Sequence, residues 1–251
     1  MKFHVIKCND DMRYDYVEKI LAEDGHEIVE PENAEAVVFP MLASKDGVHI
    51  TGTDIVLADF LKRIPENAIR FGGKADFPVT DYLMKDTFRP ANAMPTAEGA
   101  LTVAMTNCPV TVSNMKAMVI GYGCVADHLC RMLKALGADV TVSVRNEVRL
   151  AKAKSCGYHA VPLSQIRPAF ENKDVIFNTV PARLFDEEDM KFINKNSLFI
   201  EIAVGAGCMD MEKAKEMGID YRFEPKLPGR FSPRTAAKAI VESIYDSLQQ
   251  K

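Results

Sequence analysis

The sequence predicts an α/β protein in which a Rossmann-type, doubly wound parallel sheet follows a smaller α/β domain. Three observations predict this fold. Strand-like and helix-like segments alternate between about residues 114 and 223, which is typical of a parallel sheet. A glycine-rich turn, Gly121-Tyr-Gly-Cys-Val-Ala126, stands between the first of these strands and the first helix. A second alternating segment, residues 1–93, precedes them.

Each element of the later segment has a local signal. Valines alternate with Thr141 and Ser143, which is typical of a strand. Glycines follow three helix-like stretches where a left-handed residue commonly ends a helix, and Asp186-Glu-Glu-Asp gives another helix an acidic first turn. In chain order we expect strands near residues 117–120, 140–144, 159–161, 174–178, 198–203 and 219–223. We expect one helix that ends near residue 136, a second over residues 147–154, a third that begins near residue 186 and a fourth over residues 211–217.

The first segment, residues 1–93, is expected to be a substrate-side domain. Thr96 is a candidate N-cap for a connecting helix within residues 94–114, and residues 115–231 form the nucleotide-binding domain. The apolar stripe of a last helix, 233–249, predicts that it packs back on the first domain, so that two chain crossings form a hinge. In the first domain we expect strands near residues 5–6, 27–29, 36–39 and 68–71, and helices near 14–21 and 55–64.

Composition narrows the class of function. The 31 basic and 35 acidic residues leave a net charge of −4 without a basic patch, which argues against binding to nucleic acid or anionic membranes. No apolar run approaches the ~18 residues that span a bilayer, and charges interrupt the first residues too early for a signal peptide. The six cysteines lack CxxC or histidine spacing, so no metal site is expected. We expect a cytoplasmic protein that acts on a small molecule.

The turn between the first strand and helix of the later domain predicts a dinucleotide site. Gly121 makes the tight turn, Gly123 lets a pyrophosphate approach the backbone, and Ala126 lets the helix pack closely on the strand. The pyrophosphate would then lie on the helix N-terminus, beside Tyr122, Cys124 and Val125.

The end of the second strand indicates which nucleotide is preferred. The acidic Asp139 lies at the start of that strand, on the edge away from the ligand. Ser143, Arg145, Asn146 and Arg149 stand at the other end, where they would attract the 2′-phosphate of NADP(H) rather than NAD(H). The alternative is that these arginines belong to a solvated surface.

The fourth strand ends in Asn178-Thr-Val-Pro181, at the same carboxyl edge of the sheet. Asn178, Thr179, Val180 and Pro181 are therefore candidates for contact with the nicotinamide-side ribose, and a plain strand-to-helix turn is the alternative. Leu227-Pro-Gly229 follows the sixth strand at that edge or is merely a loop. No hydrolase or phosphoryl-transfer motif occurs.

Several motifs together resemble the A subunit family of dipicolinate synthase. Their order along the chain and their spacing are similar to that family over about residues 90–240, whereas residues 202–208 and Cys124 depart from its pattern. The resembling stretches are Asn92-Ala-Met-Pro-Thr-Ala-Glu-Gly99, Val119-Ile-Gly-Tyr-Gly123, Leu133-Lys-Ala-Leu-Gly-Ala-Asp-Val140, Ile176-Phe-Asn-Thr-Val-Pro181, Leu227-Pro-Gly229 and Pro233-Arg-Thr-Ala236.

The resemblance implies a function. It implies a two-domain arrangement like that of 2-hydroxyacid dehydrogenases, and oxidation of a dihydrodipicolinate-level compound to dipicolinate in sporulation, with a flavoprotein-like second subunit. We also expect a homo-oligomer. Thr96 and Glu98 are catalytic candidates, although Glu98 is equally a first-turn carboxylate. Candidates for binding a dicarboxylate are Asn92, Lys226, Gly229, Arg230 and Arg234.

Two other functions remain open. One alternative is a non-catalytic subunit that binds a nicotinamide nucleotide, and the other is a dehydrogenase for a different small molecule.

Overall fold

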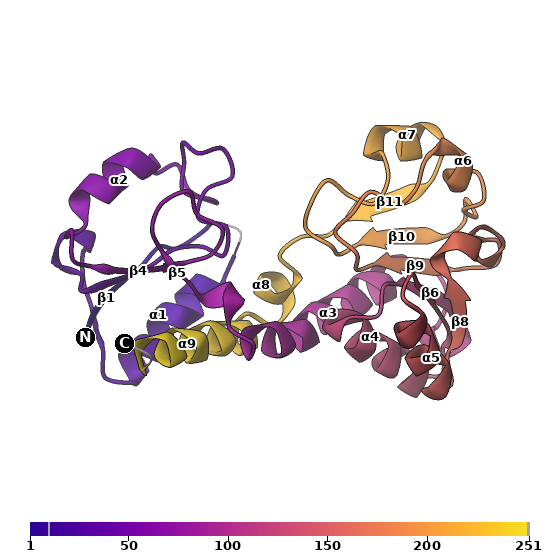
Figure 1. Ribbon diagram of the computed structural model, residues 1–251, viewed down its shortest axis with the longest axis horizontal. Coiled ribbons are helices and arrows are strands. Elements are labelled where there is room, and N and C mark those ends of the chain that lie inside the picture. Colours follow the sequence, from indigo (N-terminus) through magenta and orange to yellow (C-terminus); the bar gives the residue numbers. More distant parts are fainter. Residues whose placement is uncertain (10, 250–251) are drawn as a thin grey trace. The chain divides into compact units, whose positions relative to one another are not determined.

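The computed structural model describes residues 1–9 and 11–249 and divides into two compact units. The N-terminal unit is Met1–Pro95 together with the chain from Pro228 onward, and the second unit is Thr96–Leu227 (Figure 1). The chain therefore passes between the units twice. No helix among the described residues is long and apolar enough to cross a membrane.

The N-terminal unit is built on a five-stranded parallel sheet in the order β2-β1-β3-β4-β5. The central strand β3 has no exposed residue, as expected for a parallel sheet covered on both faces. The last strand, β5, was not predicted, because two residues give no periodic pattern. The elements are β1 (Lys2–Val5), α1 (Arg13–Glu23), β2 (Glu27–Ile28), β3 (Ala36–Val38), α2 (Leu57–Arg63), β4 (Ile69–Gly72) and β5 (Thr80–Asp81).

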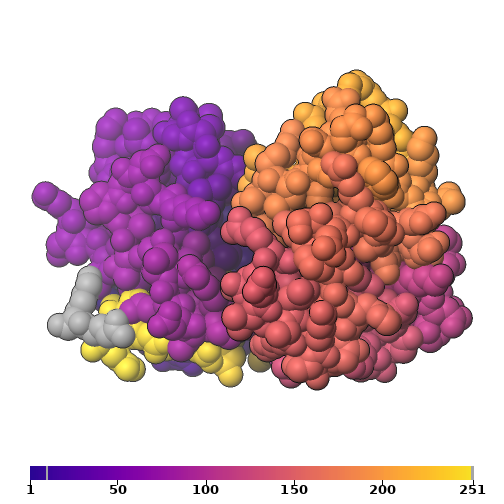
Figure 2. All heavy atoms as spheres, turned by 45° about the vertical axis from the view of Figure 1, so that its right-hand side comes forward, coloured from indigo at the N-terminus to yellow at the C-terminus, as the bar shows by residue number. Residues whose placement is uncertain are grey.

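The C-terminal helix α9 (Pro233–Gln249) completes this unit. Figures 1 and 2 show it, in yellow, beside the indigo and purple N-terminal elements. Its buried residues Ala237, Ile240 and Ile244 share one core with Tyr14 and Val17 of α1. The apolar stripe seen in the sequence is thus covered by α1.

The second unit contains a six-stranded parallel sheet in the order β11-β10-β9-β6-β7-β8. The strand order reverses between β6 and β9, and ligands of doubly wound sheets bind beyond the carboxyl ends of the strands at this point. The elements are β6 (Lys116–Ile120), α4 (Cys124–Ala135), β7 (Asp139–Val144), α5 (Glu147–Ser155), β8 (His159–Pro162), β9 (Val175–Asn178), α6 (Glu187–Met190), β10 (Leu198–Glu201), α7 (Met211–Glu216) and β11 (Asp220–Phe223).

Two helices correct the sequence-based expectations. Helix α3 (Phe88–Asn107) starts well before Thr96, so Thr96 is not an N-cap and Glu98 is not in a first turn. Pro95 lies inside this helix, where it cannot donate a backbone hydrogen bond. The Leu227-Pro-Gly229 stretch forms the short helix α8 (Leu227–Phe231) rather than a loop.

Candidate functional site

The turn between β6 and α4 has the geometry of a phosphate-binding loop. Gly121 has φ = +96°, and a Cβ there would lie 2.9 Å from Cγ2 of Val180 and closer still to the Thr179 hydroxyl. This position therefore requires glycine, both for its backbone angle and for the close approach of the β9–α6 loop.

Gly123 serves a different purpose in the same turn. It is the N-cap of α4 with φ = −95°, no side chain caps the helix, and a Cβ there would meet no atom within 4 Å. The first N–H groups of this 12-residue helix are thus left for an external acceptor, and the space above them is open. A pyrophosphate fits this site, because the free N–H groups suit its negative charge and no protein atom fills the space at Gly123.

The other residues of the turn contribute backbone rather than side chains. Ala126 is fully buried, which allows α4 to pack closely on the sheet. The Tyr122 side chain turns into the core, 6.1 Å from the Tyr158 ring between centroids, and burial raises the pKa of its hydroxyl. Cys124 is exposed at the first position of the helix, and Val125 is half-buried.

The end of β7 carries the groups that were predicted to select the nucleotide. Ser143 is fully buried, and its hydroxyl has no hydrogen-bond partner among the described residues. Arg145 and Arg149 are exposed, and neither guanidinium pairs with any group in residues 1–9 or 11–249. The side chain of Asn146 instead caps α5, accepting a hydrogen bond from the Arg149 N–H at 3.0 Å. Two uncompensated cations therefore remain available at this strand end.

The side chain of Asn178, at the end of β9, forms hydrogen bonds within the protein. It is fully buried; its Nδ2 donates to the Val180 carbonyl at 2.9 Å and to Glu201 at 2.7 Å, and its Oδ1 accepts from the Val180 N–H at 3.1 Å. The Asn178 side chain thus holds the backbone at Val180 in place, and its contact with a ribose stays a prediction.

Glu201, at the end of β10, is the centre of this network and was not predicted. Its buried carboxylate accepts hydrogen bonds from Asn178, from the N–H groups of Ala203 (3.1 Å) and Cys208 (2.9 Å), and from the Tyr221 hydroxyl (3.1 Å). Burial raises the pKa of Tyr221, with a further contribution from the Glu201 charge, so the phenol stays protonated and donates. One carboxylate therefore joins the carboxyl ends of β9 and β10 to the Tyr221 side chain of β11.

The remaining predicted residues are distributed over both units. The catalytic candidates Thr96 and Glu98 lie on α3 in the second unit, Thr96 half-buried and Glu98 exposed. Lys226 also belongs to the second unit and has an unusual φ of +59°. The other four dicarboxylate-binding candidates belong to the N-terminal unit: Asn92, Gly229, Arg230 and Arg234.

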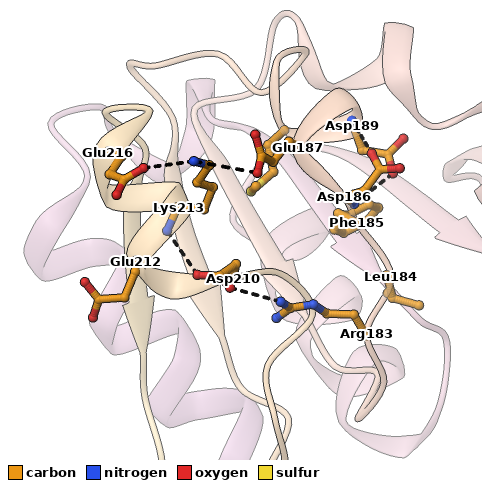
Figure 3. A pocket seen from close by; sticks show the side chains of 11 residues that line it. Arg183, Leu184, Phe185, Asp186, Glu187, Asp189, Asp210, Glu212, Lys213 and Glu216 are labelled. Carbon is orange, nitrogen blue, oxygen red and sulfur yellow. Dashed lines mark hydrogen bonds and ion pairs between the residues drawn. The ribbon is translucent and has the colours of Figure 1, made fainter.

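A pocket of about 580 Å³ in the second unit is separate from the phosphate-binding turn (Figure 3). Six carboxylates and only two basic residues line it, an unsuitable charge balance for an anionic ligand. Figure 3 shows Lys213 between Glu187 (3.7 Å) and Glu216 (3.1 Å), and Arg183 against Asp210 (3.3 Å). None of the predicted site residues lines this pocket.

No three His, Cys, Asp or Glu side chains of the described chain are grouped to hold a metal ion.

Comparisons with known proteins agree with this architecture. The family model for shikimate/quinate 5-dehydrogenase matches residues 102–217. The transhydrogenase of Sinorhizobium meliloti has a similar structure, with a TM-score of 0.72 at 13% identity over 99% of this chain and 93% of that one. The protein therefore has the fold of the two-domain, Rossmann-type dehydrogenases.

A more specific likeness covers nearly the whole chain. The A subunit of dipicolinate synthase from Bacillus subtilis (strain 168) is 23% identical over 257 residues, spanning 98% of this chain and 82% of that protein. The crystal structure of the corresponding A subunit from Bacillus halodurans has a TM-score of 0.87 at 21% identity, covering 99% of this chain and 97% of that one. The resemblance found in the sequence is confirmed, and it extends to the N-terminal unit.

Proposed function

We propose that the protein is an NADP-dependent oxidoreductase that oxidises a cyclic dicarboxylate, as dihydrodipicolinate is oxidised to dipicolinate. The observation that carries the proposal is the pair of uncompensated arginines, Arg145 and Arg149, at the end of β7 beside an open phosphate-binding turn. The likeness to the A subunit of dipicolinate synthase supports the substrate class and a second subunit.

Different residues of the chain would bind the nucleotide, bind the substrate and accept the proton. Bound NADP would supply the hydride acceptor. The α4 N-terminus would hold the pyrophosphate, Arg145 and Arg149 the 2′-phosphate, and the backbone of residues 179–181 the nicotinamide-side ribose. Glu98 is the candidate that takes the proton released when the substrate loses a hydride, and Thr96, two residues earlier on α3, is the second catalytic candidate. The cationic candidates for the substrate carboxylates are Lys226, Arg230 and Arg234.

The reaction itself is tested by a hydride-transfer assay. Purified protein should reduce NADP in the presence of a dihydrodipicolinate-level substrate, measured by the absorbance of the reduced nicotinamide, alone or after addition of a co-purified second subunit. Nucleotide binding without reduction under both conditions would contradict catalysis and favour a nicotinamide-nucleotide-binding partner subunit instead. Turnover only with simple hydroxy acids would favour a different dehydrogenase.

Cofactor preference is tested by replacing Arg145. The Arg145→Ala variant should bind NADPH about 10- to 100-fold more weakly, because it loses one charge-assisted hydrogen bond, while NADH binding should change little. Fluorescence titration with both nucleotides measures this. Arg131→Ala is a matched control, since Arg131 is exposed on α4 and pairs with Asp127. Equal affinity of the unaltered protein for NADPH and NADH would contradict the preference.

A further inference from the structure

The N-terminal unit contains a buried ion pair that no part of the site described so far uses. Asp11 precedes α1 and Arg13 is the first residue of that helix, and their side chains are only 5% and 6% exposed. Arg13 donates from Nε to Oδ1 at 2.7 Å and from Nη2 to Oδ2 at 2.5 Å, so the pair is bidentate. Asp11 thereby fixes the plane and direction of the guanidinium.

The opposite edge of the guanidinium lacks a strong acceptor. Arg13 Nη1 faces Sδ of Met41, and a thioether is a weak acceptor for a charged donor. Met41 follows β3, is only half-buried, and has a flexible side chain that changes rotamer easily. The charged edge of Arg13 is therefore covered by a movable, weakly bonded group.

The pair lies where parallel sheets bind ligands. The segments after β1, β3 and β4 emerge at the same carboxyl edge of the sheet, and Arg13 and Met41 lie on the first two of them. Gly229 of helix α8 lies against the pair: a Cβ at Gly229 would be 3.0 Å from Asp11 Cγ and 3.4 Å from Arg13 Nε. The motif that suggested a dicarboxylate site thus meets the ion pair through its backbone.

Stability alone is a weak reason for such a pair. Well-packed apolar residues of similar volume commonly replace a buried ion pair without loss of stability. A guanidinium with one edge fixed by an aspartate and the other edge free is, in contrast, well suited to receive a second, planar carboxylate in bidentate fashion.

We propose that Arg13 binds a carboxylate of the substrate through its Nη1 edge, with Asp11 as the positioning residue and Met41 as a cover that moves aside. The inference rests on the proposed function for its ligand class, a cyclic dicarboxylate. It adds a binding residue, Arg13, that the sequence motifs did not indicate.

The experiment separates a binding role from a structural one. Single replacement of Arg13 leaves Asp11 charged and buried, so the chief variant is the double replacement Asp11→Leu/Arg13→Met, which keeps the site filled with apolar groups. Calorimetric titration with pyridine-2,6-dicarboxylate, in the presence of NADPH, should show binding weakened about 10- to 100-fold. Thermal unfolding and NADPH affinity should stay close to those of the unaltered protein.

Two further variants sharpen the test. Met41→Ala should tighten dicarboxylate binding, because the guanidinium edge is uncovered, whereas a purely structural role predicts no gain. Arg63→Gln removes an exposed ion pair with Glu32 in the same unit and should change nothing. A folded double variant that binds pyridine-2,6-dicarboxylate as tightly as the unaltered protein would overturn the proposal.

The ligand series distinguishes this proposal from the proposed function. Binding of a monocarboxylate such as pyruvate, but not of pyridine-2,6-dicarboxylate, would contradict the proposed substrate class. The role of Arg13 would still be supported if the double variant lost that binding. Failure of the unaltered protein to bind any carboxylate in the series would contradict both.

Discussion

Replacing Gly123 by alanine should abolish most nucleotide binding while leaving the fold intact. Gly123 has an extended backbone conformation that alanine also adopts, and a Cβ there would meet no protein atom within 4 Å. The new methyl group would instead occupy the space in which a pyrophosphate approaches the first N–H groups of α4. Loss of one to two charge-assisted hydrogen bonds, each about 1.5–3 kcal/mol, should weaken NADPH binding about 100-fold or more.

Two other glycines provide controls for this experiment. Gly218 ends α7 with φ = +73° and has open space around its Cβ position, so Gly218→Ala should lower stability by about 1 kcal/mol without affecting NADPH affinity. Gly121→Ala should lower both, because its Cβ would press on Val180 and Thr179. Titration and thermal unfolding of the three variants measure both effects. Unchanged NADPH affinity in Gly123→Ala would show that the turn does not hold a phosphate.

The turn could be predicted from sequence because its signals are local. Gly121 and Gly123 stand at fixed spacing between an apolar strand and an amphipathic helix, and that context is visible in a dozen consecutive residues. The structure agrees with both elements. The start of α3 was predicted wrongly because Thr96 matched a local rule for capping residues, whereas tertiary packing buries Phe88 and Ala93 in the earlier turns of the helix.

The parts of the site that escaped prediction depend on long-range contacts. Glu201 looks like an ordinary charged residue at the end of an apolar strand, and its partners lie 20 or more residues away on β9 and β11 or on the backbone of its own loop. The Asp11–Arg13 pair is local in sequence, but its burial arises from Met41 and Gly229. A carboxylate inside a predicted apolar strand end was the only available signal for Glu201.

Replacing Glu201 by alanine should produce the largest loss of stability in the second unit. Three hydrogen-bond donors, on Asn178, Cys208 and Tyr221, would lose their acceptor inside the protein, and leaving a buried donor unsatisfied costs about 1–3 kcal/mol each. The Ala203 N–H keeps a second acceptor, the Asn178 carbonyl, at 3.3 Å. A total of about 4 kcal/mol corresponds to a fall in Tm of roughly 8–16 °C for a protein of this size. Thermal unfolding followed by circular dichroism measures it.

Glu201→Gln separates the role of the charge and the second oxygen from that of side-chain volume. The amide keeps one acceptor for Asn178 and Ala203, but its NH₂ group would face the Cys208 N–H, where two donors meet. We therefore expect an intermediate loss of stability and faster amide hydrogen exchange in residues 203–208, whereas NADPH affinity should change little because Asn178 keeps its acceptor. Glu212→Gln, on the exposed surface of α7, is the matched control and should be neutral. If Glu201→Gln matched this control in Tm and in hydrogen exchange, the carboxylate would not organise the loop at the end of β10.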